Sequence, residues 1–255
     1  MNYRFLTFSF VCLLSLGNAL AQEDQMVTDR PDQTESAYVV PQGRFQLESG
    51  FVYYKNGSDF YAYDYNTSLL RYGLTKGVEL RLGVGYIGYR IDDYWDEFND
   101  DGFAPIVLGA KVLLAEEQNG LPRIALLGSF ALPNTGAEEF QLDNLGVDIR
   151  TTMEYTLTAK VSLGANLGVM WSGNSINEDP SVVYSAVIGY AVNDKMGLFG
   201  ELFGSLHSDS DDFHSLDMGL TYKVTDTFQL DASTGFGLSD FAPDYFVSFG
   251  FSVLF

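Results

Sequence analysis

The dominant feature of this sequence is a series of long tracts in which apolar and polar side chains alternate at every second residue. In "VELRLGVGY", Val78, Leu80 and Leu82 face one side of an extended chain, opposite Glu79 and Arg81. Twelve such tracts, mostly of 10 to 13 residues, follow one another from Gly43 onward. Strands of ordinary globular proteins average ~5–6 residues, whereas tilted strands that cross a membrane need ~9–11. The length of the tracts therefore favours a membrane β-barrel over a soluble β protein.

The connections between the tracts alternate in length and charge. Those after even-numbered tracts are mostly tight, such as "LTAK" and "VTDT", whereas those after odd-numbered tracts are mostly longer and acidic, such as "IDDYWDEFNDDG" and "LHSDSDDFH". Only "KNGSD" and "AEEQNGLP" break this rule mildly. Short periplasmic turns, long external loops and an even strand number are typical of outer-membrane barrels. We therefore predict an all-β fold, a transmembrane antiparallel up-and-down barrel of twelve strands over residues 43–255, with a short N-terminal non-strand segment before it.

The two faces of the tracts differ as the lipid and the lumen of a barrel require. Aromatic residues lie near both ends of the apolar faces, as at the two membrane interfaces: Tyr53, Tyr86, Trp171 and Tyr245 at one end, and Tyr72, Tyr155, Phe228 and Phe255 at the other. The tract from Phe60 to Tyr72 places Tyr61, Tyr63, Tyr65, Thr67 and Leu69 on one face. Charged residues on the opposite faces would be solvated or paired in a lumen: Glu79, Arg81, Lys111, Arg123, Asp148, Arg150, Glu154 and Asp231. In a soluble core these charges would be costly.

The two ends of the chain carry expected targeting signals. Residues 1–21 have the positive start, apolar run and small "ALA" residues of a secretory signal peptide, and the run is short for the alternative, a retained membrane anchor. The single cysteine, Cys12, lies within it, so the mature chain would have no disulfide and no thiolate site. Phe255, in phase with the apolar face of the last tract, resembles the terminal aromatic residue that serves outer-membrane proteins as a signal to the barrel-assembly machinery.

The sequence offers little support for an enzyme, a metal site or a nucleic-acid partner. Its two histidines, His207 and His214, lie in or beside an acidic loop without the "HxS" spacing of twelve-stranded lipases, and we interpret them as solvated polar residues. The acidic loops lack the spacing of an EF-hand calcium site. We interpret them as solvated loops, with weak bridging by divalent cations to lipopolysaccharide as the alternative. A formal net charge of −20 disfavours binding to phosphate backbones. We predict no catalytic residue, no cofactor and no metal.

One motif is specific enough to indicate a family. "TDRPDQTES", Thr28 to Ser36, followed by "VVPQGRFQLESGF", resembles the start of the outer-membrane "transporter" family described as MetA-pathway of phenol degradation. The matching residues are Thr28, Asp29, Arg30, Pro31, Asp32, Thr34, Glu35 and Ser36, then Pro41, Gly43, Gln46, Glu48 and Gly50. The resemblance implies an outer-membrane channel for small compounds, with aromatic or hydrophobic ones as the family's suggested substrates.

The motif itself cannot be a membrane strand, because Pro31 removes a ladder donor and its charges would be costly against lipid. Residues 22–42 are therefore expected on the periplasmic side or folded back into the lumen. For the lumenal alternative we predict two sets of ion pairs. Arg30 would pair with interior carboxylates such as Glu48 or Glu79. Asp32 and Glu35 would pair with Arg81 or Arg150, and the segment would act as a small plug that narrows the pore. A disordered periplasmic tail is the other alternative.

The function that fits these features best is passive transport of small solutes through the outer membrane of a Gram-negative-type bacterium. The alternative is a structural or adhesive barrel with a closed lumen and acidic external loops. We expect outer-membrane lipid, lipopolysaccharide and the barrel-assembly machinery as partners, and a monomeric state.

Overall fold

The structure is a computed structural model that describes residues 26–92, 97–175, 179–208 and 210–255. The predicted signal peptide lies outside the described residues. Among those described, no helix is long and apolar enough to cross a membrane. The strands are β1 (Phe45–Asn56), β2 (Phe60–Thr75), β3 (Val78–Asp92), β4 (Glu97–Phe103), β5 (Val107–Ala115), β6 (Arg123–Ala131), β7 (Gly146–Thr158), β8 (Val161–Trp171), β9 (Ser181–Ala191), β10 (Met196–Leu206), β11 (Phe213–Thr225), β12 (Phe228–Gly237) and β13 (Tyr245–Leu254).

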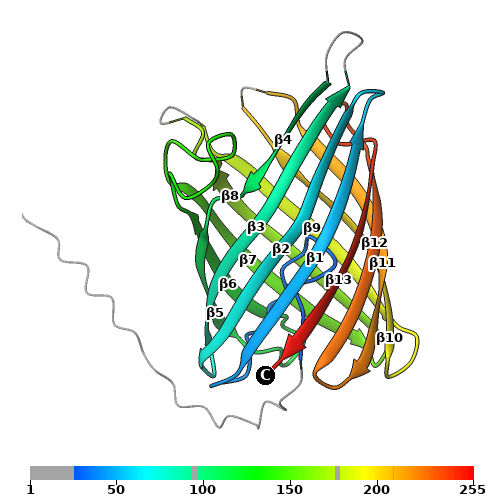
Figure 1. Ribbon diagram of the computed structural model, residues 1–255. Coiled ribbons are helices and arrows are strands. Elements are labelled where there is room, and N and C mark those ends of the chain that lie inside the picture. The colour runs from blue at the N-terminus through cyan, green and yellow to red at the C-terminus, as the bar shows by residue number, and fades with distance from the viewer. Residues whose placement is uncertain (1–25, 93–96, 176–178, 209) are drawn as a thin grey trace, which may run out of the picture.

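Twelve of these strands form a closed antiparallel barrel (Figure 1). Strands that follow one another in sequence pair with each other, except that β3 pairs with β5 in the barrel wall. The ring closes where β1 pairs with β13, from Gln46↔Leu254 to Lys55↔Tyr245. The predicted twelve-stranded barrel is confirmed. The extra strand, β4, pairs with β3 in the region expected to be the loop "IDDYWDEFNDDG", because β3 continues beyond the barrel wall and offers a free edge there.

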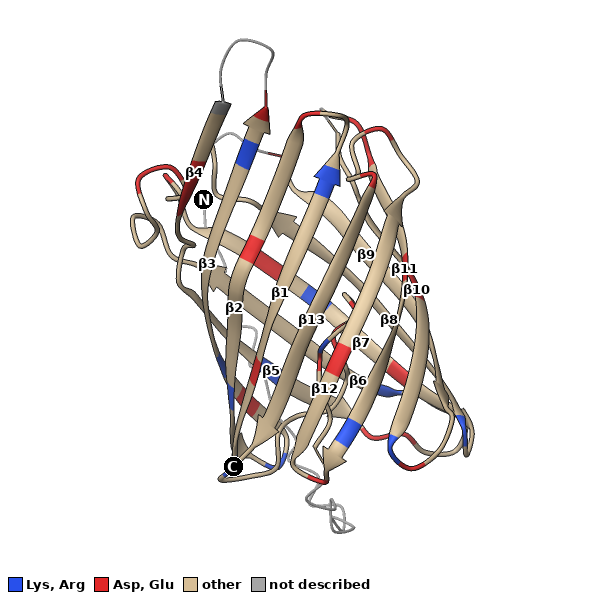
Figure 2. Ribbon diagram, turned by 45° about the vertical axis from the view of Figure 1, so that its right-hand side comes forward, with Lys and Arg blue, Asp and Glu red and all other residues tan. Residues whose placement is uncertain are grey.

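Side chains are distributed in the opposite way from a soluble protein. Leu80 and Leu202 on the outer face are 44% and 40% exposed, whereas Glu79 and Lys111 on the inner face are fully buried. Apolar side chains outside and charges inside suit a wall between lipid and a polar lumen. The C-terminus lies at one end of the barrel, and the acidic connecting loops lie mainly at the other (Figure 2).

The alternation in β2 differs from the sequence prediction at one point. The pairing of β2 with β3 shifts at a bulge between Asp64 and Asn66, and a bulge moves the following side chains to the opposite face. Tyr63 and Tyr65 stack outside the barrel, with ring centroids 5.3 Å apart. After the bulge, however, Arg71 is fully buried, while Tyr72 packs against Phe45 on the outer face. The prediction that Thr67 and Leu69 share the face of Tyr61 and Tyr63 is therefore wrong.

Candidate functional site

Residues 26–42 form a loop inside the barrel, which we call the lumenal loop (Figure 1). Its two arms meet near the C-terminal end of β13, where Met26 and Val40 form an apolar cluster with Leu254. The second arm passes so close to β2 that a Cβ atom on Gly73 would lie 2.2 Å from the carbonyl oxygen of Pro41. Glycine at this position therefore allows the backbone contact that leads the chain from the loop into β1.

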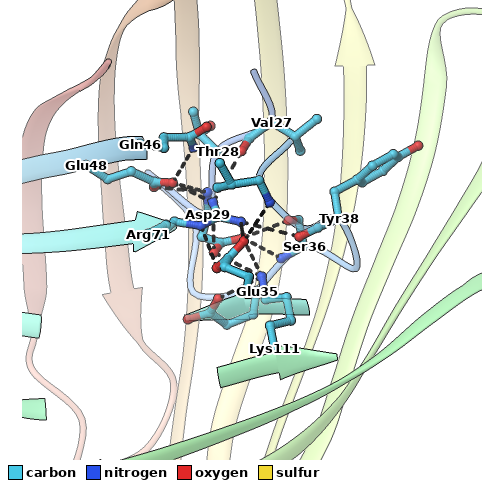
Figure 3. Close-up of polar contacts among 12 residues, drawn as sticks. Val27, Thr28, Asp29, Glu35, Ser36, Tyr38, Gln46, Glu48, Arg71 and Lys111 are labelled. Carbon is cyan, nitrogen blue, oxygen red and sulfur yellow. Dashed lines mark hydrogen bonds and ion pairs between the residues drawn. The ribbon is translucent and has the colours of Figure 1, made fainter. Parts of the chain in front are cut away.

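Asp29 is the central contact of the lumenal loop with the wall (Figure 3). Its Oδ2 atom lies 3.0 Å from Nη1 of Arg71, 2.9 Å from Nη1 of Arg81 and 3.0 Å from Nζ of Lys111. Its Oδ1 atom accepts hydrogen bonds from the backbone N–H and the hydroxyl of Ser36, at 3.0 and 2.7 Å. One carboxylate thus joins the two arms of the loop to three strands, β2, β3 and β5.

The wall around Asp29 carries more positive than negative charge. Arg71 lies 2.6 Å from Glu48 and 2.8 Å from Glu79, its two acidic partners on the strands. Together with Arg81 and Lys111, these residues form a cluster on the wall that contains three cations and two carboxylates. Asp29 and Glu35 of the loop provide the remaining negative charge. Glu35 lies 2.9 Å from Arg81 and 3.4 Å from Lys111.

The electrostatic surroundings keep Asp29 ionised. Burial alone would raise the pKa of Asp29, but the positive charges of Arg71, Lys111 and Arg81 outweigh that effect and hold its pKa well below the ordinary value. A carboxyl group with a lowered pKa in the folded state adds stability above its ordinary pKa and loses it only as the pH falls through the lowered value. The anchor at Asp29 is therefore expected to persist in mildly acidic medium.

Arg30 extends from the tip of the loop to β12 and β13, which follow β1 in the ring of strands. Its guanidinium lies 2.9 Å from Asp231 on β12 and donates to Ser248 on β13 at 3.0 Å. It occupies space above Gly50 and Gly250, where a Cβ atom would come within 2.4 Å of the guanidinium. Arg30 therefore pairs with an interior carboxylate, as predicted, but this partner is neither of the two examples, Glu48 and Glu79, because Arg71 already holds both.

Glu48 instead accepts hydrogen bonds from the backbone of the loop, from the N–H groups of Asp29 and Arg30 at 3.0 Å each. The Glu48 side chain therefore also holds the loop near Asp29, but it binds the backbone of the loop and not its side chains.

Asp32 also has different surroundings from those predicted. No ion pair joins it to Arg81 or Arg150 among the described residues, and Arg150 pairs instead with Asp148 on its own strand, at 2.6 Å. Asp32 faces Glu201 and Asp217, which are cross-strand neighbours on β10 and β11. Burial and the negative charge of Glu201 raise the pKa of Asp32 well above its ordinary value.

The loop and the wall leave a series of cavities along the lumen. One of about 610 Å³ lies at the end of the barrel with the turn residues Lys160 and Lys195, one of about 220 Å³ lies beside the loop tip, and one of about 400 Å³ contains Phe213 and Phe241. The first two share Arg30, Pro31 and Asp32 as lining residues, and the last two share Gln33, Tyr54 and Phe246. The loop tip thus lies where these spaces adjoin.

Both histidines make specific hydrogen bonds, so the prediction that they are simply solvated is wrong. Nδ1 and Nε2 of His207 lie 2.8 Å from the hydroxyls of Ser181 and Ser205. Nδ1 of His214 lies 2.7 Å from the Tyr184 hydroxyl. Ser205 lies two residues before His207, whereas Ser181 and Tyr184 come from β9, which is distant in the sequence from both histidines. Among the described residues, no group of three or more His, Cys, Asp or Glu side chains is arranged to hold a metal ion.

Comparison with solved structures identifies the same fold in outer-membrane proteins. An outer membrane channel from Pseudomonas putida F1 matches with a TM-score of 0.70 and 14% identity, over 88% of this chain and 100% of that chain. The KdgM porin matches with a TM-score of 0.54 and 10% identity, over 82% of this chain and 98% of that one. The NanC porin matches with a TM-score of 0.54 and 9% identity, over the same shares.

Among curated proteins, none matches the chain significantly. The model of the family described as "Putative MetA-pathway of phenol degradation" matches residues 28–255, which include the lumenal-loop motif and the whole barrel. A match over that range establishes the relationship that the motif "TDRPDQTES" and the barrel pattern indicate. The chain belongs to this family of outer-membrane β-barrel proteins.

Proposed function

We propose that this protein is a passive channel of the outer membrane for small solutes, aromatic or hydrophobic compounds among them, and that it catalyses no reaction. The observation that carries the proposal is the series of adjoining cavities through the lumen, which meet at the tip of the lumenal loop. Solved channels and porins with the same fold support it, as does the family match. In this proposal the loop is a plug that narrows the route without chemistry of its own.

Removal of residues 22–41 tests both parts of the proposal. The shortened barrel is expected to have a larger single-channel conductance than the full protein in planar lipid bilayers, because the charged loop no longer occupies the lumen. An unchanged conductance would contradict the plug. If vesicles containing either protein release no small solute at all, the channel itself is wrong, and a structural barrel with a closed lumen replaces it.

The plug is expected to hold more firmly in mildly acidic medium. A carboxyl group whose pKa is raised in the folded state favours that state below its ordinary pKa and loses this contribution as the pH rises through the raised value. Because the pKa of Asp32 is raised, docking of the loop should weaken from about pH 4 upward, and conductance should be higher at about pH 8 than at about pH 5. Asp32→Asn should flatten this dependence; if the variant keeps the full pH response, Asp32 is not its source.

Insertion into the outer membrane is expected to depend on Phe255. This residue is 62% exposed, and its backbone N–H donates to the carbonyl oxygen of Phe45, which keeps the end of the chain at the β1–β13 closure. Deleting Phe255 should strongly reduce the amount of heat-modifiable, membrane-integrated barrel, while Phe255→Tyr should retain most of it. Equal amounts of folded protein in the deletion and in the wild type would rule out the assembly signal.

A further inference from the structure

We propose that the part of the wall covered by the Arg30 side chain is a binding site for solutes that carry a guanidinium group, which Arg30 occupies until such a solute takes its place. Four wall residues form this site, which we call the guanidinium seat: Gly50 on β1, Asp231 on β12, and Ser248 and Gly250 on β13. The inference rests on the proposed channel function and names a class of solute for it. Its first support is a guanidinium group already bound there, that of the lumenal loop itself.

The floor of the seat is a pair of glycines. Gly50 and Gly250 face each other across the β1–β13 closure. A Cβ atom on either glycine would lie 2.3 to 2.5 Å from three atoms of the Arg30 guanidinium. Such similar distances to three atoms of a planar group mean that the group lies flat on the two backbones. The floor therefore fits a flat cation, and a side chain on either glycine would fill it.

The edge of the seat matches the hydrogen-bond donors of a guanidinium. Nη2 of Arg30 donates to Oδ1 of Asp231 at 2.9 Å and to the Ser248 hydroxyl at 3.0 Å, and Nε donates to Oδ2 of Asp231 at 3.4 Å. Two donors on one edge of the plane thus meet the two oxygens of one carboxylate, as is typical of guanidinium recognition. An ammonium group meets a carboxylate as a point charge and would leave the flat floor unfilled.

The seat depends on a cation. The side chain of Asp231 is fully buried, and Arg30 is its only ion-pair partner among the described residues. If the Arg30 side chain moves away, this carboxylate is left inside the wall without a partner, which is strongly unfavourable. A guanidinium ion that enters the lumen relieves this cost by taking the vacated space. The wall therefore favours exchange of one guanidinium for another over an empty seat.

The seat adjoins open space on more than one side. Arg30 lines the cavity of about 610 Å³ at the turn end and the one of about 220 Å³ beside the loop tip, which Ser248 also lines. It lines a further cavity of about 370 Å³ as well. The Arg30 side chain itself is 16% exposed. A solute in any of these cavities therefore lies next to the group that it would replace.

The loop stays docked without the Arg30 side chain, because its neighbours in the chain have their own contacts. Asp29 contacts three cations of the wall, and the N–H of Gln33 donates to Glu201 at 2.7 Å. A tethered side chain competes as a ligand with an effective concentration on the order of millimolar. The seat should therefore hold a solute weakly, and weak retention allows a solute to leave a channel again.

Replacing Arg30 with alanine tests the seat, because ethylguanidinium is the part of the side chain that this substitution removes. Titration calorimetry of the full barrel in detergent at neutral pH should show that Arg30→Ala binds ethylguanidinium about tenfold more tightly than propylammonium, which has the charge but not the plane. Ethylurea, which has the plane but not the charge, should not bind measurably. Affinity for propylammonium or ethylurea equal to that for ethylguanidinium would overturn the seat.

Second substitutions in the Arg30→Ala background locate the binding. Asp231→Asn and Gly250→Ala should each weaken ethylguanidinium binding by about tenfold, the first by removing the charge and the second by placing a methyl group on the floor. The matched controls are Asp226→Asn, which changes an exposed aspartate between β11 and β12, and Gly128→Ala, where a Cβ atom meets nothing within 4 Å. Heat-modifiable mobility shows that each variant is folded. Equal losses in the controls and at the seat would contradict the proposed location.

The wild-type protein provides a second measurement. Because Arg30 competes, wild type should bind ethylguanidinium about tenfold more weakly than Arg30→Ala does, and Asp231→Asn alone should abolish this binding. Wild-type binding that survives Asp231→Asn would overturn the seat, and a wild type that binds no ethylguanidinium would overturn the exchange with Arg30.

Single-channel recordings separate this inference from the proposed function. Selective binding of ethylguanidinium to a barrel that carries no current would leave the seat and contradict the channel. A conducting barrel without selective binding would do the reverse.

Discussion

Replacing Asp29 with alanine is expected to raise the single-channel conductance several-fold. The substitution removes the carboxylate that contacts Arg71, Arg81 and Lys111, and with it both hydrogen bonds that join the arms of the lumenal loop at Ser36. Breaking a buried ion pair by removing one partner costs about 3–5 kcal/mol. The substitution leaves the hydrogen bonds between the barrel strands unchanged, so the lost free energy comes from docking of the loop to the wall. The loop should therefore leave the lumen.

Two measurements distinguish this result from a general disturbance. Limited proteolysis should cleave the loop of Asp29→Ala while leaving the barrel intact, as judged by heat-modifiable mobility. Asp240→Ala, which removes an exposed aspartate from an external loop, should change neither conductance nor proteolysis. A variant at Asp29 with wild-type conductance and a protected loop would show that the remaining contacts of Arg30 and Glu35 are sufficient to hold it.

Replacing Arg71 with methionine is expected to destabilise the whole barrel by about 3–5 kcal/mol, because it leaves buried carboxylates without their shared cation. Arg71 is fully buried and contacts Asp29, Glu48 and Glu79, two of which lie on the strands β1 and β3. Unlike the change at Asp29, this one places unbalanced negative charge on the wall itself. Urea titration of the barrel in lipid vesicles, followed by tryptophan fluorescence, would measure the loss in the free energy of unfolding.

The chain offers a close control for this substitution. Arg90 pairs with Asp92 at 2.6 Å near the end of β3, where the two side chains are 45% and 38% exposed. Exposed pairs contribute about 0–1 kcal/mol, so Arg90→Met should have little effect. The double variant Arg71→Met/Glu48→Gln should recover part of the lost stability, since it also removes one of the carboxylates that the loss of Arg71 leaves unpaired. No recovery would mean that Arg71 acts by packing rather than by charge.

The architecture could be predicted from the sequence because a β-barrel in lipid imposes a simple pattern on its strands and connections. Every strand must cross the membrane, keep apolar residues outside and connect alternately by short and long segments. These demands act on each tract separately, so twelve local patterns indicate one closed structure. The strand β4 was not predicted because it lies beyond the membrane wall, where neither length nor alternation is imposed by lipid.

The position of Arg71 could not be read from simple alternation, since the bulge near Tyr65 reverses the two faces of β2. One signal was nevertheless present in the sequence. Tyr72 fits the aromatic girdle, and a girdle residue must face outward, which turns Arg71 inward. Counting back from the girdle at the turn would therefore have found the residue that pairs with Glu48 and Glu79.

The contacts of the loop were harder to predict, because facing side chains compete for the same partners. Arg150 and Asp148 lie two residues apart on one face of β7 and satisfy each other locally, which leaves Arg150 unavailable to Asp32. Glu48 is similarly taken by Arg71, so Arg30 extends to Asp231 instead. The Glu35–Arg81 pair, by contrast, is present at 2.9 Å. Sequence patterns indicate which charges face the lumen, but the choice among partners depends on three-dimensional reach.

The position of the lumenal loop in the chain has a consequence for the order of folding. The loop precedes all the strands of the barrel in the sequence, yet Arg30 contacts Asp231, which is 201 residues further along the chain. Other residues of the loop contact β2, β3, β5 and β10 among other strands, so the final contacts of the loop require strands from both ends of the sequence. Such distant contacts form late, after the intervening chain is ordered. The lumen of a newly inserted barrel is therefore expected to stay hydrated and unsealed until its last strands have joined.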